Sequence, residues 1–310
     1  MSKANRIPSQ PLPWRLVCLA ALFGLSACTS GTPAAVPDGP GRILTLQNTE
    51  IDEASGLVVS RTDHQRLWLH NDSGGAARLY AVDPNGQDLG QVDIRGVANT
   101  DWEDMATYTM GGAHFLLVAD VGDNNGIRPA VRLHVLAEPE TPNGELAPLR
   151  SLTVVYPDGP RDCEAVAVDD AALSVYLLTK RDTPPRLYRV PLNTGLPVAS
   201  AEFLGTVESI PAPTADDLTD DPEFGQNRSQ PTAMSFSAAG DRALIVTYKD
   251  AYLYTRSQDE SWLQALNRAP RVVDLPQFAQ TEASGLNAAG DLTFVGSEQL
   301  PAALVEIALP

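Results

Sequence analysis

Four glutamates are the residues of this chain best suited to chemistry, because each opens a copy of one short motif: Glu53, Glu103, Glu164 and Glu282. The motif Glu-Ala-Ser-Gly-Leu occurs in full at 53–57 and again at 282–286, and a weaker copy begins at Thr232. If the copies are equivalent units of a closed ring, the four carboxylates face one channel. Repulsion between them would then raise their pKa values, and a bound cation is the simplest way to neutralise them.

The ligand type favours calcium. Oxygen ligands from several chain segments, without thiolates and with few histidines, suit Ca²⁺ better than Zn²⁺. The four glutamates are therefore predicted metal ligands, and in the fourth copy Thr232 offers a hydroxyl or carbonyl oxygen, directly or through water. The alternative interpretation is that the glutamates lie in solvated loops between units and cap turns.

A second set of charged residues ends the apolar run that follows each motif: Asp72, Asp120, Lys180, Lys249 and Glu298. These residues should surround the mouth of the channel that the four glutamates face. We group them with Asp101, Asp104, Asp123 and Arg181 as predicted ligand-binding residues. Cations beside a carboxylate-bound metal suit a phosphate or carboxylate ligand. Mutual ion pairs among these residues are the alternative. No Gly-x-Ser-x-Gly pentapeptide and no glycine-rich phosphate loop occurs, so no catalytic residue is assigned.

The elements that must position these residues are short strands separated by turn formers. In the first unit the pattern predicts strands at 54–60, 65–70, 78–82 and 89–94. Four short antiparallel strands per repeat are typical of a β-propeller blade, and no segment sustains a helical period. The chain is therefore predicted to be all-β, with five blades.

The final unit contains only three predicted strands, at 283–287, 292–295 and 303–307. We expect Arg42–Gln47 to supply the fourth and close the ring, because closure leaves no long edge strand exposed. Six blades remain an alternative if the segment Asp259–Leu275 forms more than a fourth strand and its loop.

The first 28 residues have the features of a bacterial lipoprotein signal. Three basic residues precede an apolar run at 16–25 that is too short to span a bilayer, and Leu-Ser-Ala-Cys ends at Cys28. This resembles a lipobox and predicts lipidation of Cys28. The residue after it is Thr29 rather than Asp, which favours the outer membrane over the inner, and the expected location is the periplasmic face. The alternative is an ordinary secretory signal. Residues 29–41 are predicted to be a flexible tether, and residues 42–310 a single propeller domain.

The charge limits the partners. With 39 acidic and 22 basic residues the formal net charge is −17, which disfavours nucleic acid and anionic lipid headgroups. Membrane attachment is therefore expected only through the lipid. The other expected partners are a periplasmic protein or an anionic small molecule, and the chain is expected to be a monomer.

Several motifs resemble those of a largely uncharacterised family of secreted bacterial β-propellers. They are Asp101-Trp102-Glu103-Asp104-Met105-Ala106, Val118–Asn125 with Arg128, Tyr156-Pro157-Asp158-Gly159, Asp162-Cys163-Glu164-Ala165 and Thr179-Lys180-Arg181. The family is loosely similar to calcium-dependent phytase-like, SdiA-regulated and calcium-activated nucleotidase propellers. The resemblance implies a cation in the axial channel held by Glu53, Glu103, Glu164 and Glu282. The phytase motif Asp-Asp-Pro-Ala is absent, and Cys163 stands where the family usually has a small residue.

Two functions follow as hypotheses. The first is an anchored periplasmic lipoprotein whose calcium-stabilised propeller binds a ligand or partner. The second is a calcium-dependent hydrolase of phosphate or other ester substrates. Geometry should separate them, because the hydrolase requires Lys180, Arg181 and Lys249 to face the mouth rather than to be paired with carboxylates.

Overall fold

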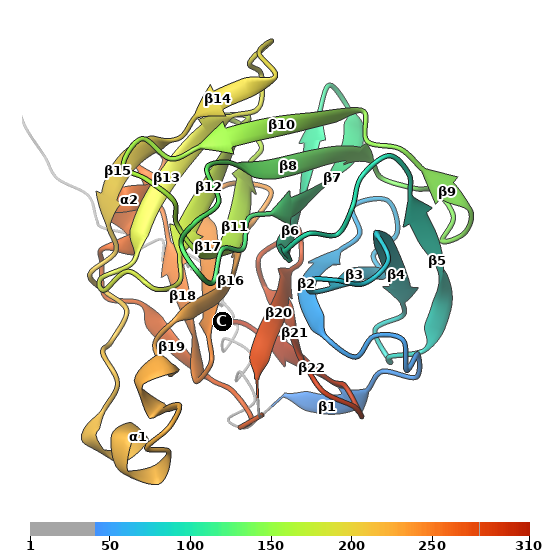
Figure 1. The fold of residues 1–310 in the computed structure, drawn as a ribbon. Helices are drawn as coiled ribbons and strands as arrows, with labels where there is room; N and C mark the ends of the chain where they lie inside the picture. Colours follow the sequence, from blue (N-terminus) through green and yellow to red (C-terminus); the bar gives the residue numbers. More distant parts are fainter. Residues whose placement is uncertain (1–40, 279) are drawn as a thin grey trace, which may run out of the picture. The chain divides into compact units, whose positions relative to one another are not determined.

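Five β-sheets make up nearly all of the regular structure (Figure 1). The structure is a computed structural model that describes residues 41–278 and 280–310. The prediction of an all-β, five-bladed β-propeller is confirmed. The predicted signal segment with Cys28, and the tether up to residue 40, lie outside the described residues. Within the described ranges, no helix has the length and apolar character needed to cross a membrane.

Blades 1 to 3 follow one another along the chain. Blade 1 contains β2 (Ala54–Val59), β3 (Leu67–Asn71), β4 (Arg78–Val82) and β5 (Asp88–Ile94), with β9 (Glu145–Leu146) added beside β5. Blade 2 contains β6 (Trp102–Met110), β7 (Ala113–Asp120), β8 (Val131–Ala137) and β10 (Arg150–Val155), with β14 (Val198–Ser200) added beside β10. Blade 3 contains β11 (Cys163–Asp169), β12 (Ser174–Thr179), β13 (Arg186–Pro191) and β15 (Glu202–Thr206).

Blade 4 contains β16 (Pro231–Phe236), β17 (Arg242–Thr247), β18 (Asp250–Thr255) and β19 (Arg271–Asp274). The connection before it forms α1 (Ala215–Asp220) and the 3₁₀ helix η1 (Gly225–Asn227). Between β18 and β19 lies α2 (Trp262–Leu266). The segment 259–275 thus supplies a short helix and a fourth strand rather than a blade, and the six-blade alternative is excluded.

Blade 5 is completed by the start of the propeller domain. Its three C-terminal strands are β20 (Thr281–Leu286), β21 (Leu292–Ser297) and β22 (Ala303–Ala308), and β1 (Arg42–Thr45) pairs antiparallel with β22. The guanidinium of Arg42 also contacts the carboxylate of Glu306 at 2.7 Å. The predicted closure is therefore confirmed, and it hides the edge that β22 would otherwise expose.

The first strands of the five blades contact one another around the axis: β2, β6, β11, β16 and β20. All residues of β2, β11 and β20 are buried, because neighbouring blades cover both faces of these strands. Apolar clusters join adjacent blades, as where Trp68 of blade 1 and Trp102 of blade 2 share one core. The packing holds the starts of the five strands, and the residues before them, in a fixed ring.

Candidate metal centre

Each first strand begins with a β-bulge, and three of the bulges carry a predicted glutamate. The pairing register is interrupted around Glu103 in blade 2, Glu164 in blade 3 and Glu282 in blade 5. A bulge leaves one residue without a partner and re-aims its side chain. These three glutamates are almost fully buried, with 2%, 3% and 5% of their surface exposed.

Glu53 does not share this position, which corrects the sequence prediction. Its backbone carbonyl accepts the N–H of Asp72, in the way that the carbonyls of Asp101, Asp162 and Gln280 accept those of Val121, Lys180 and Glu298. Glu53 is thus equivalent to residues two places before the bulge glutamates. Ser55 occupies the bulge in blade 1, and its hydroxyl donates to the carbonyl oxygen of Glu103 at 2.5 Å. Glu53 is exposed because the two identical pentapeptides differ in register by two residues.

The second strands place one residue of each blade at the mouth, directly after the last ladder pair: Asp72, Val121, Lys180, Tyr248 and Glu298. Three of these were predicted. Asp120 and Lys249 were each assigned one residue away from the true position, and a shift of one residue turns a strand side chain to the opposite face. Asp120 instead pairs with Arg128 at 2.6 Å, and Lys249 pairs with Asp217 at 2.7 Å.

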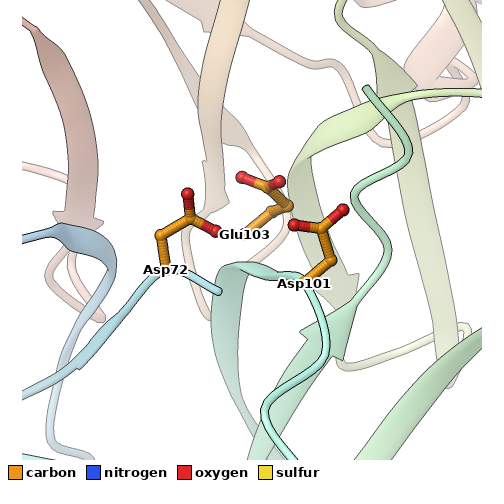
Figure 2. A group of neighbouring side chains, drawn as sticks. All are labelled: Asp72, Asp101 and Glu103. Carbon is orange, nitrogen blue, oxygen red and sulfur yellow. The ribbon is translucent and has the colours of Figure 1, made fainter. Parts of the chain in front are cut away.

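Two groups of three carboxylates have oxygens within 4.8 Å of one another, and both include Glu103. The first group contains Asp72, Asp101 and Glu103, and Figure 2 shows their carboxylates turned toward one another. The second group contains Glu103, Asp162 and Glu164. Oxygen donors at this spacing are suitable for a hard divalent cation.

Gly122 makes room for the shared glutamate. A Cβ at this position would lie 2.1 Å from Oε1 of Glu103 and 2.7 Å from Oδ2 of Asp101. The backbone therefore approaches the two carboxylates more closely than any residue with a side chain would allow. This explains the glycine in the motif Gly122-Asp123-Asn124-Asn125.

The carboxylate of Glu103 accepts no hydrogen bond and forms no ion pair within the described ranges, although only 2% of the surface of this residue is exposed. Burial raises its pKa well above the ordinary value, and the charges of Glu164 and Asp72 raise it further. Burial also raises the pKa of Asp72 to about 6. A buried carboxylate without a partner is costly, so the first group fits a bound cation.

The second group already has cationic partners. Lys180 forms an ion pair with Glu164, and Nε of Arg181 contacts Oδ2 of Asp162 at 2.5 Å. The other oxygen of Asp162 accepts the backbone N–H of Asp123 at 2.9 Å. Burial raises the pKa of Glu164, and Lys180 opposes that rise.

Glu282 lies in a chain of contacts on the other side of Lys180. The ammonium of Lys180 donates to the hydroxyl of Tyr248 at 2.7 Å, and this hydroxyl donates to Oε1 of Glu282 at 2.7 Å. Burial and a hydrogen bond with Glu282 raise the pKa of Glu298 to about 9. Glu282 therefore belongs to the same axial network but is absent from the two carboxylate groups.

Two predicted ligand-binding residues are engaged in structural contacts instead. One oxygen of Asp104 accepts the backbone N–H groups of Val166 at 2.7 Å and Met234 at 3.2 Å, which ties blade 2 to blades 3 and 4. Asp123 accepts two backbone N–H groups of its own loop, from Ile127 and Arg128. These contacts favour a positioning role for both carboxylates.

A cavity of about 550 Å³ opens beside the axial network. It is lined by Asp221, Phe224, Asn227, Arg228, Tyr248, Phe278, Gln280 and Gln299. These residues come from the η1 region, from the end of β17 and from the loops that flank β20 and β21. Because Tyr248 also contacts Lys180 and Glu282, the cavity borders the axial network at this residue.

Sequence reasoning missed Asp162 and Tyr248 as site residues. The signal for Asp162 was present, because Asp101-Trp102-Glu103 and Asp162-Cys163-Glu164 repeat the same Asp-x-Glu spacing. Tyr248 was not identified because its neighbour Lys249 is charged, and the prediction looked for a charged residue at the end of each apolar run.

The similarity to known proteins is distant. No protein-family model and no curated protein sequence matches the chain. Among solved structures, the pyrroloquinoline quinone-bound aldose sugar dehydrogenase of Streptomyces coelicolor is 11% identical, with a TM-score of 0.47, over 88% of this chain and 99% of that one. The RRP9 WD40 repeats are 10% identical, with a TM-score of 0.45, over 86% of this chain and 97% of that one. The chain is a β-propeller, and membership of the family that its motifs resemble stays a prediction.

Proposed function

We propose that this chain is a lipid-anchored binding protein whose propeller holds Ca²⁺ at Asp72, Asp101 and Glu103. The ion and the adjoining cavity form the recognition site for a ligand or a periplasmic protein. The observation that carries the proposal is the carboxylate of Glu103, which is buried, without a partner in the described chain and directed at two other carboxylates. A divalent cation would provide the missing partner.

Calcium is the ion that these donors suit best. The three carboxylates come from two blades and are arranged irregularly, and Ca²⁺ accepts six to eight oxygens in flexible geometry, whereas Mg²⁺ demands a near-ideal octahedron. Backbone carbonyls and water can complete the coordination sphere. No thiolate or histidine belongs to either carboxylate group, which disfavours zinc.

The hydrolase hypothesis has less support. It required three cations to be available at the mouth, and each of them is paired with a carboxylate: Lys180 with Glu164, Arg181 with Asp162, and Lys249 with Asp217. A phosphate ligand would have to compete with these pairs. Binding without chemistry makes no such demand.

The cavity supports a ligand-binding role. Its volume lies within the range of about 300–1,000 Å³ that is usual for small-molecule sites, and its walls combine aromatic rings with amide groups. Phe224 is 57% exposed, which leaves its ring accessible to a ligand. Tyr248 connects this wall to Lys180 and Glu282 of the axial network, so a ligand in the cavity would lie beside that network.

Anchorage at the periplasmic face of the outer membrane completes the proposal and rests on the sequence Leu25-Ser26-Ala27-Cys28. The test is mass spectrometry of the membrane fraction. A lipid-modified N-terminal peptide beginning at Cys28 is expected, and Cys28→Ala should release the protein from the membrane. An unmodified Cys28, or a mature chain that starts elsewhere, contradicts the anchor.

The metal site is tested by crystals grown with CaCl₂ and examined for anomalous scattering. The expected result is one peak bonded to oxygens of Asp72, Asp101 and Glu103 at about 2.3–2.6 Å. Glu103→Gln should remove the peak, whereas Glu140→Gln, which changes an exposed glutamate, should not. No peak in the wild type at millimolar calcium contradicts the proposal.

A further inference from the structure

The two carboxylate groups share Glu103 but differ in their cations. Asp72, Asp101 and Glu103 form no ion pair within the part of the chain that the structure describes. In the second group, both Asp162 and Glu164 contact a basic side chain. The carboxylates of the first group therefore form no direct ion pair, whereas the second group includes two.

Lys180 is built into the second side. Its side chain is only 7% exposed, and its ammonium contacts Glu164 from blade 3 and the hydroxyl of Tyr248 from blade 4. That hydroxyl in turn donates to Glu282 of blade 5. The ammonium thus lies where groups from three blades converge, as a metal ion in this channel would.

Lys180 occupies a position that acidic residues occupy in other blades. At the equivalent position of the second strand, blades 1 and 5 carry the acids Asp72 and Glu298. Blade 3 alone places a cation among them in the described ring.

We propose that Lys180, assisted by Arg181, is a resident cation that fills the Asp162–Glu164 side of the centre and limits the protein to one divalent ion. Replacing Lys180 by an uncharged residue then opens a second divalent site at Glu103, Asp162 and Glu164. This inference rests on the proposed calcium site at Asp72, Asp101 and Glu103, which it makes more specific.

The consequence concerns the kind of chemistry available. Two divalent ions about 3.5–4 Å apart stabilise both the attacking and the leaving oxygen in many phosphate-cleaving enzymes. An ammonium held by Glu164 and Tyr248 offers no open coordination position. The wild-type centre is thereby a one-ion site, suited to binding rather than to two-metal hydrolysis.

The test is isothermal titration of the purified full chain with CaCl₂, with circular dichroism to verify folding. The wild type should bind one Ca²⁺ and Lys180→Met two. Lys180→Arg, which keeps the charge, should bind one. Adding Glu164→Gln to Lys180→Met should return the stoichiometry to one. If the wild type binds one ion, a single ion in Lys180→Met overturns the inference. Two ions in the wild type or in Lys180→Arg also overturn it.

A second variant keeps the inference testable if Lys180→Met does not fold. The side chain of Arg181 is 46% exposed, so Arg181→Gln should be tolerated. Loss of one nearby positive charge should tighten calcium binding about three- to tenfold. Unchanged or weaker binding contradicts the role assigned to the two cations.

The outcomes also separate the inference from the proposed function. A wild type that binds no calcium, together with a Lys180→Met variant that binds one, would refute the ion at Asp72, Asp101 and Glu103 but support Lys180 as a resident cation. No calcium in either protein contradicts both.

Discussion

Gly122 and Glu103 lie against each other at the mouth end of blade 2, with no space for a side chain between them. A Cβ on Gly122 would lie 2.1 Å from Oε1 of Glu103. Gly122→Ala must therefore displace the carboxylate of Glu103. We expect a loss of calcium affinity of at least about tenfold, equivalent to about 1.4 kcal/mol, measured by isothermal titration.

The matched control is Gly75→Ala. A Cβ at Gly75 meets no atom within 4 Å, so this variant should bind calcium like the wild type. If Gly122→Ala keeps full affinity while Gly75→Ala behaves as expected, Glu103 is not a ligand.

Calcium removal should destabilise the protein more at high pH than at low pH. Without the ion, the pKa of Glu298 is raised from 4.5 to about 9 and that of Asp72 from 3.8 to about 6, in both cases chiefly by burial. Between the unfolded and folded pKa values, the folded state binds more protons than the unfolded state, so the free energy of unfolding falls as pH rises through this window. Bound Ca²⁺ stabilises the ionised carboxylates and opposes the fall.

The measurement is the melting temperature with excess chelator and with excess calcium, at about pH 5 and about pH 8.5. The gap between the two conditions should widen by several degrees at the higher pH, since about 1 kcal/mol corresponds to roughly 2–4 °C in a domain of this size. With chelator present, Glu298→Gln should lose less stability than the wild type as the pH rises from about 5 to about 8.5. An equal gap at both pH values would be inconsistent with calcium acting on these carboxylates.

Lys249 should matter for the α1 segment and not for the ion. Its ammonium contacts Asp217, which also caps α1 by accepting the backbone N–H of Thr214. Burial tends to raise the pKa of Asp217, but Lys249 and Thr214 lower it to about 2. Because the side chain of Lys249 is 33% exposed, Lys249→Met should cost no more than about 1 kcal/mol.

Hydrogen exchange is the appropriate readout for this variant. Exchange should become faster in residues 215–227, and calcium affinity should be unchanged. A loss of calcium affinity as large as that expected for Gly122→Ala would show that Lys249 belongs to the metal centre after all.

The fold could be predicted from the sequence because the repeat encodes it in several independent ways. The alternating strands and the turn formers predicted the blades. The three-strand final unit predicted that the segment after Gly41 closes the ring. Each blade folds mainly through contacts with its own neighbours in sequence, so local pattern was sufficient. The short helix α2 was not predicted, since a helix of five residues leaves little periodic signal.

The site could be predicted only in part, because its geometry depends on register. Glu103, Glu164 and Glu282 were identified by their motif, and bulges at the strand starts aim them as expected. Glu53 has the same local sequence as Glu282, but hydrogen bonding to Asp72 places it two residues away in the ladder. Long-range pairing decides register, and a pentapeptide does not contain that information.

The central claim is that Glu103 and its neighbours hold calcium, and thermal melting of the wild type and Glu103→Gln tests it most directly. Ligand at a hundredfold excess over its dissociation constant stabilises a folded protein by about 2.7 kcal/mol, which corresponds to roughly 5–10 °C here. Chelator should abolish that gain in the wild type, and Glu103→Gln should show little of it, while Glu140→Gln should retain it. A wild-type melting temperature indifferent to both chelator and added Ca²⁺, or a full calcium-dependent rise in Glu103→Gln, would contradict the account.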